Sequence, residues 1–206
     1  SLIEKDFFLA ENLKKKYSDC NNIKVYNSDV LKFDIEKITT KNTIIFGNLP
    51  YNISSQILVK FLKFKKWPPK FNDLIFMFQK ELGKKIIGVY PSSDYGRIAI
   101  LSNFRLNVLN KFYVSPNCFF PKPKVTSMVI HFRTKKKNSF TIKNISNLEK
   151  VTNILFSNKR KMINKNIKKI LTENKIKDIQ DLKLNLRPSD INPEVYYKIT
   201  ELYEKK

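Results

Sequence analysis

Histidine, cysteine and glycine are scarce in this 206-residue chain, which has one histidine (His131), two cysteines (Cys20 and Cys118) and four glycines. A zinc site or a Ser/His/Asp triad would need more histidine or cysteine, so we predict neither. One disulfide is possible by count. The cysteines lie far apart without a Cys-x-x-Cys pair, however, which favours two free thiols in a reducing compartment. His131 lies in an apolar, alternating stretch and is interpreted as structural.

Long apolar runs are also absent. No stretch of about 18 apolar residues occurs that could span a membrane, and residues 1–20 show no signal-peptide pattern. A hydrophobic share of 42% is nevertheless sufficient for a buried core. These features predict a soluble protein of the cytoplasm, or of an organelle if the source is a eukaryote.

Acidic side chains are few: 18 Asp and Glu stand against 40 Lys and Arg, which gives a net charge of +22. The imbalance is strongest between residues 95 and 170, where Glu149 is the only acid against seventeen Lys and Arg. This asymmetry favours a polyanion partner over a merely solvated basic surface. Nucleic acid is the leading candidate. An anionic membrane is less favoured, because no long basic amphipathic helix with exposed aromatics occurs.

The first eighty residues alternate short apolar runs with helical periodicity, a pattern typical of a parallel α/β sheet. The predicted strands are residues 1–4, 23–26, 43–46 and 74–78, and the predicted helices are residues 6–17 and 54–64. We expect the second helix to be capped by Ser54 or Ser55.

The later part of the chain follows a different pattern. Residues 106–114 and 125–132 read as two strands around a proline-rich turn, which predicts an antiparallel hairpin that closes the sheet. After a basic linker, helical periodicity at residues 148–171 and 193–203 appears without any strand pattern. We therefore predict two parts, which are an α/β domain over residues 1–138 and a small all-α domain over residues 139–206.

The tetrapeptide Asn48-Leu49-Pro50-Tyr51 directly follows a predicted buried strand. An exocyclic adenine amine is a poor nucleophile, because its lone pair is delocalised into the ring. Two acceptors on its hydrogens, the Asn48 side-chain oxygen and the Leu49 carbonyl, would localise that lone pair. Pro50 keeps the carbonyl out of a helix, and Tyr51 offers a stacking face for a base. By itself the tetrapeptide is also a common turn.

Two acids occupy positions that suit a bound nucleotide. Glu4 ends the first predicted strand and would accept hydrogen bonds from ribose hydroxyls. Asp29 follows the next strand and would accept from an adenine amine. Each acid alone is equally compatible with a helix cap or an ordinary loop. The glycines are isolated, so no Gly-x-Gly-x-Gly loop is present.

Residues 48–55 resemble the active-site loop of the ribosomal RNA adenine dimethyltransferases, the kasugamycin-resistance type of the small subunit. Further segments resemble the same family in order along essentially the whole chain. They are Gln79-Lys80-Glu81, Tyr95-Gly96-Arg97, residues 119–127 (as F-x-P-x-P-x-V-x-S), residues 156–161 (as F-x-x-R-R-K) and Leu186-Arg187-Pro188.

The resemblance implies a class I (Rossmann-like) methyltransferase sheet, the cofactor S-adenosyl-L-methionine and no metal. It places Glu4 on the cofactor's ribose, Asp29 on its adenine, and Asn48 beside both the cofactor and the target amine. Tyr51 and Phe119 would sandwich the flipped target base; we also expect one of Phe119 and Phe120 to be a core residue. The implied RNA-binding residues are Lys122, Lys124, Lys159, Arg160, Lys161 and Lys165, with Lys168 and Lys169 extending the last cluster.

The implied reaction is dimethylation of two adjacent adenosines near the 3′ end of small-subunit rRNA, within a partly assembled subunit, by a monomer. Two alternatives remain. The first is the antibiotic-resistance methyltransferase of large-subunit rRNA, against which Leu49 and the helical tail argue. The second is a non-catalytic RNA-binding assembly or transcription factor, against which the intact loop at residues 48–51 argues.

The sequence departs from the family in two respects. Lys159 and Lys85 stand where the family usually has arginine, which keeps phosphate attraction but loses bidentate geometry. In the family a first strand and a glycine-rich loop precede the strand that ends at Glu4. Because neither precedes it here, we expect the 206-residue chain by itself to be inactive.

Overall fold

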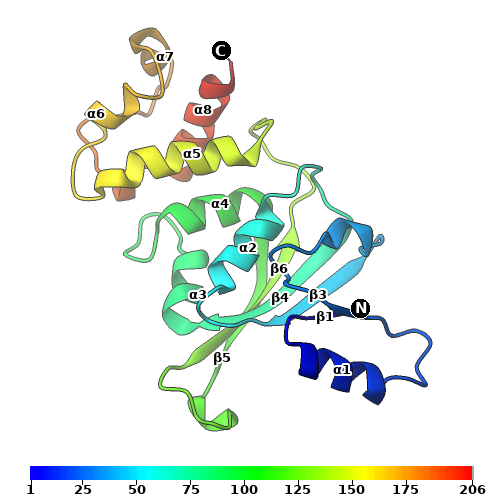
Figure 1. The fold of residues 1–206 in the computed structure, drawn as a ribbon. Helices are drawn as coiled ribbons and strands as arrows, with labels where there is room; N and C mark the ends of the chain where they lie inside the picture. Colours follow the sequence, from blue (N-terminus) through cyan, green and yellow to red (C-terminus); the bar gives the residue numbers. More distant parts are fainter. Residues whose placement is uncertain (206) are drawn as a thin grey trace.

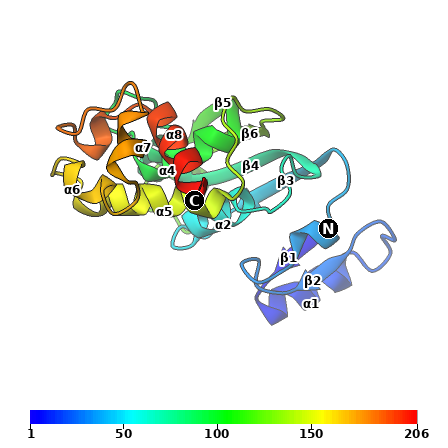
Figure 2. The ribbon, with the colours of Figure 1, turned by 90° about the horizontal axis from the view of Figure 1, so that it is seen from above.

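The computed structural model describes residues 1–205, and its N-terminal part is a small β-α-β unit. Strand β1 (Leu2–Glu4) is followed by helix α1 (Phe7–Lys16) and by strand β2 (Val25–Asn27), which pairs parallel to β1. The Asp6 carboxylate caps α1 by accepting from the Leu9 amide at 2.9 Å. The predicted strand-helix-strand order is therefore confirmed. Figure 2 shows this unit beside β3, at the far end of the molecule from the C-terminal helices.

The main sheet has four strands in the order β3-β4-β6-β5. Strands β3 (Thr43–Asn48) and β4 (Phe71–Gln79) are parallel, whereas β6 (Ser127–Thr134) is antiparallel to both β4 and β5 (Leu106–Val114). A parallel sheet that ends in an antiparallel hairpin was predicted and is confirmed. Within residues 1–205, no strand hydrogen bonds join β1 to β3, so the two sheets stay separate.

One face of the main sheet is covered by α2 (Ser54–Leu62), α3 (Lys80–Ile86) and α4 (Arg97–Arg105) (Figure 1). The sequence reading missed α3 and α4. A glycine inside α3 weakens its helical pattern, but a Cβ at Gly83 would lie 2.5 Å from Met128 Sδ, so the close approach to β6 favours glycine. The expected serine cap of α2 is wrong, because its N-cap is Ile53.

Residues 139–205 form helices and no strand, as predicted. They are α5 (Ile145–Leu155), α6 (Asn164–Ile167), α7 (Glu173–Lys177) and α8 (Pro193–Glu204), which gather above α4 in Figure 1. Short 3₁₀ turns are found at Ile35–Lys37, Pro116–Cys118, Phe156–Asn158 and Pro188–Asp190.

The prediction of one helix over residues 148–171 is wrong, because residues 156–163 interrupt it between α5 and α6. In that interruption the Ile163 amide donates to the Leu186 carbonyl at 3.0 Å. This bond to a distant segment turns the chain, so that Ile163 and Ile167 are both completely buried. Local periodicity carries no information about such a bond, and the prediction failed for that reason.

A continuous hydrophobic core joins the sheet to the C-terminal helices. Two buried tyrosines tie the parts together: the Tyr95 hydroxyl donates to the Ile191 carbonyl at 3.0 Å, and the Tyr197 hydroxyl donates to the Ile100 carbonyl at 3.1 Å. Burial raises the pKa of both phenols, so they remain neutral donors. The C-terminal helices are thereby held firmly against α4.

The scarce residues have ordinary positions. His131 Nε2 lies 2.9 Å from Asp73 Oδ1, an acid that also accepts from Arg133, so His131 is paired within the main sheet. Cys20 and Cys118 are exposed free thiols. Within residues 1–205, no helix is long and apolar enough to cross a membrane, and no three or more potential ligands cluster as a metal site would require.

Candidate active site

Strand β3 ends at Asn48, and the next five residues form a tight connection into α2. The Ile53 amide donates to the Pro50 carbonyl at 3.2 Å, and Ser54 Oγ donates to the Tyr51 carbonyl at 3.1 Å. Helix α2 is itself fixed by side chains that are buried in the core. The loop at residues 48–51 is therefore held at both ends by rigid elements.

This loop presents two unused hydrogen-bond acceptors. Asn48 is exposed, and neither its carboxamide oxygen nor the Leu49 carbonyl accepts a hydrogen bond from any residue in the range 1–205. The Leu49 side chain is half-buried and packs on the core. A Cβ at Gly47 would lie 2.5 Å from Leu49 Cδ2, so the preceding glycine leaves room for this packing. The backbone is thus anchored while both acceptors remain available.

Three segments that lie far apart in the sequence meet beside the loop. The Tyr51 hydroxyl lies 2.7 Å from Ser127 Oγ, and Ser127 is a fully buried residue at the start of β6. Because β6 runs antiparallel to β4, its start pairs with Gln79 at the end of β4. The Lys80 amide then donates to the Thr126 carbonyl at 2.9 Å. All three segments belong to those that resemble the family, but the sequence analysis assigns no role to Ser127. A contact between residues 76 positions apart leaves no periodic pattern in the sequence.

Phe119 follows the 3₁₀ turn between β5 and β6, and it is half-buried, while Phe120 is fully exposed. The expectation that one of them is a core residue is wrong. The end of the hairpin projects beyond the sheet (Figure 1), where no second layer can cover it. Lys122 and Lys124 in the same segment are exposed.

Glu4 and Asp29 lie at the carboxyl ends of the adjacent parallel strands β1 and β2. Glu4 Oε1 accepts from the Asp6 amide at 2.8 Å. Asp29 accepts from the Leu31 amide at 2.9 Å and pairs with the Lys5 ammonium at 3.0 Å. The Leu31 hydrogen bond and then the Lys5 ammonium lower the pKa of Asp29, which keeps this carboxylate ionised at neutral pH. The Lys5 side chain is 74% exposed, so a ligand could displace it.

The comparisons with known proteins identify the family. A family model described as ribosomal RNA adenine dimethylase matches residues 1–205. The chain belongs to this family. The dimethylase family is a family of methyltransferase enzymes, so the sequence-based interpretation as an enzyme is confirmed.

Two bacterial relatives carry the name ribosomal RNA small subunit methyltransferase A. The Pelagibacter ubique protein is 40% identical over 204 residues, which cover 98% of this chain and 77% of that protein. The Malacoplasma penetrans protein is 36% identical over 203 residues, which cover 97% of this chain and 71% of that protein.

Two solved structures share the fold with this dimethylase-family chain. A dimethyladenosine transferase from Plasmodium falciparum superposes with a TM-score of 0.75 at 23% identity, and the match covers 98% of this chain and 81% of that one. The 23S rRNA methyltransferase ErmE gives a TM-score of 0.67 at 21% identity, over 98% and 80% of the two chains. The predicted fold class is confirmed.

The dimethylase-family chain also carries a hollow of about 510 Å³ on its C-terminal helices, which we call the basic hollow. Its lining has no acid, and its cations form no ion pair with any described residue. The cations are Arg160, Lys161, Lys165, Lys169 and Arg187. The sequence reading assigned no RNA contact to the last of these, although it lies in a segment that had been matched to the family.

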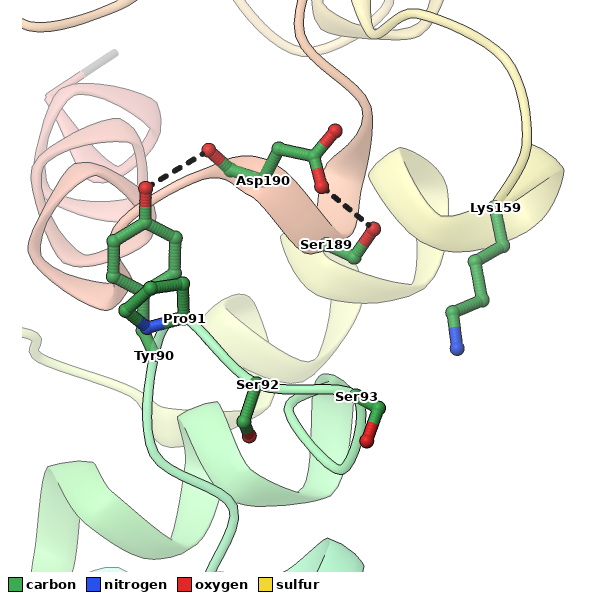
Figure 3. Close-up of a pocket in the computed structure, with 7 residues that line it drawn as sticks. All are labelled: Tyr90, Pro91, Ser92, Ser93, Lys159, Ser189 and Asp190. Atoms are coloured by element: carbon green, nitrogen blue, oxygen red, sulfur yellow. Dashed lines mark hydrogen bonds between the residues drawn. The ribbon is translucent and has the colours of Figure 1, made fainter.

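Lys159 lies outside the basic hollow. It lines a different pocket of about 490 Å³, between the loop before α4 and the last 3₁₀ turn (Figure 3). There the Tyr90 hydroxyl donates to the Asp190 carbonyl at 3.2 Å, across the pocket from Lys159. The predicted run of RNA-binding residues is thus divided between two surfaces by the turn that interrupts the helix.

Proposed function

We propose that the intact gene product transfers methyl groups from S-adenosyl-L-methionine to N6 of adenosines in small-subunit rRNA, with two adjacent adenosines near the 3′ end as the target. The observation that carries the proposal is the pair of unused acceptors at Asn48 and Leu49, fixed beside an anchored tyrosine. Family membership and the names of the two bacterial relatives support the same reaction.

The loop acts on the target amine by hydrogen bonding. The Asn48 oxygen and the Leu49 carbonyl each accept a hydrogen bond from one N6 hydrogen, which moves the nitrogen toward tetrahedral geometry and localises its lone pair. Once methylated, the cationic nitrogen would release one proton to water. These acceptors also stabilise the positive charge that develops on the nitrogen as it is methylated. Stacking of the flipped base between Tyr51 and Phe119 offsets about 1–3 kcal/mol of the flipping cost.

The chain offers a fitting set of acceptors for the nucleoside part of the cofactor. Glu4 and Asp29 are carboxylates at the ends of neighbouring parallel strands, where α/β sheets bind nucleotides. Glu4 would hold the ribose hydroxyls, Asp29 the adenine amine, and Asn48 would adjoin the methyl group. When bound, S-adenosyl-L-methionine supplies a methyl group on a positively charged sulfur, so the reaction needs no metal and no strong base.

Cations of both the α/β part and the C-terminal helical part would bind the RNA. Lys122 and Lys124 would contact phosphates beside the target base, while Lys159 and the basic hollow would hold a more distant stretch of RNA. We accordingly propose a catalytic domain at residues 1–138 and an RNA-binding domain at residues 139–206. The proposed partner is the rRNA of a partly assembled small subunit, met by a monomer in the cytoplasm.

The proposal is tested with the intact gene product, labelled cofactor and small subunits that lack adenine dimethylation. We expect up to about four methyl groups per subunit, two on each adenosine. Fully modified subunits serve as the control and should accept none. Transfer to large-subunit rRNA instead would decide for the resistance-type alternative, and RNA binding without any transfer would decide for a non-catalytic factor.

Replacing Ser127 with alanine removes the partner of the Tyr51 hydroxyl, which lies 2.7 Å away. Loss of one neutral hydrogen bond costs about 1 kcal/mol, so we expect the single-turnover rate to fall roughly fivefold with RNA affinity unchanged. The change Tyr51→Phe should have a similar effect. Because both changes break the same bond, the double variant should be no slower than the slower single variant. Losses that multiply instead would show that the two residues act independently.

A further inference from the structure

The proposed cofactor acids and the proposed catalytic loop belong to different sheets. Glu4 and Asp29 are on the β1-β2 unit, whereas the loop at residues 48–51 extends from β3 of the main sheet. No backbone ladder joins these sheets within residues 1–205. Within this range, apolar packing of Ile35 and its neighbours on the core, together with side-chain hydrogen bonds, joins the two sides.

The Lys60 ammonium supplies the hydrogen bonds of this connection. It donates to the carbonyl oxygens of Val30 and Leu31, at 2.7 and 3.0 Å, and also to the carbonyl oxygen of Phe33. These are the only hydrogen bonds between residues 1–39 and residues 43–205. An ammonium has three N–H donors, and all three of those of Lys60 donate to the turn at residues 30–33.

Burial is consistent with a fixed ammonium. Lys60 is half-buried, and burial lowers its pKa, while the charges of Asp34 and Asp29 oppose that shift. Removing an ammonium from water is costly unless its donors are satisfied, and here three carbonyls satisfy them. The side chain is thus held in one arrangement by its surroundings.

The turn at residues 30–33, to which Lys60 donates, directly follows Asp29 and is hydrogen-bonded to it. The amides of Lys32 and Phe33 both donate to the Asp29 carbonyl at 2.9 Å, and the Leu31 amide donates to the Asp29 carboxylate at the same distance. A shift of the carbonyl groups that accept from Lys60 would therefore also shift the Asp29 carboxylate.

The path from Lys60 to the loop at residues 48–51 is also short. Lys60 lies on α2, which starts directly after the catalytic loop and is bonded to it by Ser54 Oγ and the Tyr51 carbonyl. Ile57 and Leu58, on the same helix, are buried in the core. Helix α2 therefore acts as a rigid arm between the loop and the ammonium.

We infer that Lys60 is a positioning residue, whose ammonium holds Asp29 at a fixed place relative to the Asn48–Tyr51 loop. This role rests on the proposed function, because it concerns where the cofactor's adenine lies relative to the methyl acceptor. Lys60 touches neither ligand and acts through the turn at residues 30–33. Its loss should lower cofactor affinity without changing RNA affinity.

The test replaces Lys60 with methionine in the intact gene product, which keeps an unbranched stem of similar length and removes the donors. The variant should fold, because Ile35 stays buried in the core and Phe33 still packs on Tyr26, with ring centroids 5.0 Å apart. The matched control is Lys66→Met, since Lys66 is exposed and has no partner among residues 1–205. Both variants lose the same charge.

We expect the Kd for S-adenosyl-L-methionine, measured by calorimetry, to rise about tenfold in the Lys60→Met variant. This follows if the competent arrangement is populated about a tenth of the time, because affinity falls by that fraction. The rate at saturating cofactor and the RNA affinity should stay within about twofold of the wild type. Amide hydrogen exchange at residues 31–33 should accelerate. The Lys66→Met protein should match the wild type in every measurement.

Wild-type cofactor affinity in the Lys60→Met protein would overturn the inference, whether or not the turn exchanges faster. If thermal stability fell while cofactor affinity stayed the same, Lys60 would only stabilise the fold, and the inference would also be overturned. Failure of the wild-type protein itself to bind the cofactor would instead overturn the proposed function, and this role with it. The wild-type measurement thus distinguishes the two failures.

Discussion

Replacing Asn48 with alanine in the intact gene product should lower the single-turnover rate of methyl transfer by roughly 100- to 1000-fold, the usual cost of deleting one preorganised transition-state hydrogen bond. The carboxamide makes no hydrogen bond within residues 1–205, so its removal should leave the loop in place. The Leu49 carbonyl remains as the second acceptor. Affinity for RNA should barely change, because phosphate contacts dominate it.

A matched control for this variant is Asn52→Ala in the same loop. Asn52 is exposed and has no partner among the described residues, so this change should slow transfer far less. Rapid-quench measurements with enzyme in excess separate the chemical step from product release. If RNA binding fell while the single-turnover rate held, Asn48 would be a structural turn residue and the acceptor mechanism would be wrong.

The place of the loop at residues 48–51, between a strand and a helix, could be predicted from the sequence because its pattern is local. Asn48, Leu49, Pro50 and Tyr51 are consecutive, follow an apolar strand and precede a periodic helix, so their setting can be recognised without tertiary information. Glu4 and Asp29 could be placed for the same reason, since Glu4 ends β1 and Asp29 follows the end of β2 by two residues.

The supporting contacts could not be predicted in this way. Ser127 reaches Tyr51, and Lys60 reaches the turn at residues 30–33, across separations that leave no periodicity in the chain. The break before α6 depends on a backbone bond between Ile163 and Leu186, which is equally invisible to local pattern. In each case a tertiary hydrogen bond fixes a position that side-chain spacing leaves open.

The break before α6 alters which cations can act together. On a continuous helix, the consecutive residues Lys159, Arg160 and Lys161 would be turned by about 100° from one to the next and would face different sides. In the structure, Arg160 and Lys161 both line the basic hollow, with further cations that have no acid partner within residues 1–205, whereas Lys159 lines the other pocket. A concentration of unpaired positive charge in a hollow attracts phosphate more strongly than the same charges spread over a convex surface.

Replacing both Arg160 and Lys161 with alanine should weaken binding to the small ribosomal subunit and flatten its dependence on salt. Each phosphate that the protein no longer neutralises lowers the slope of log K against log salt by about 0.9, so the double variant should lose close to two units. The defect should therefore be about tenfold larger at 50 mM than at 200 mM salt. Cofactor affinity should not change, because the β1-β2 unit, whose strands lead to Glu4 and Asp29, lies at the other end of the molecule (Figure 2).

The control for this variant removes two charges at that other end, by Lys15→Ala and Lys16→Ala on α1. Net charge then falls equally, and any effect of overall charge alone should appear in both proteins. Filter-binding titrations across the salt range give both slopes. A slope that stays at the wild-type value in the Arg160→Ala, Lys161→Ala protein would mean that the basic hollow only solvates the helices, because neutralising fewer phosphates must change the number of counterions exchanged on binding.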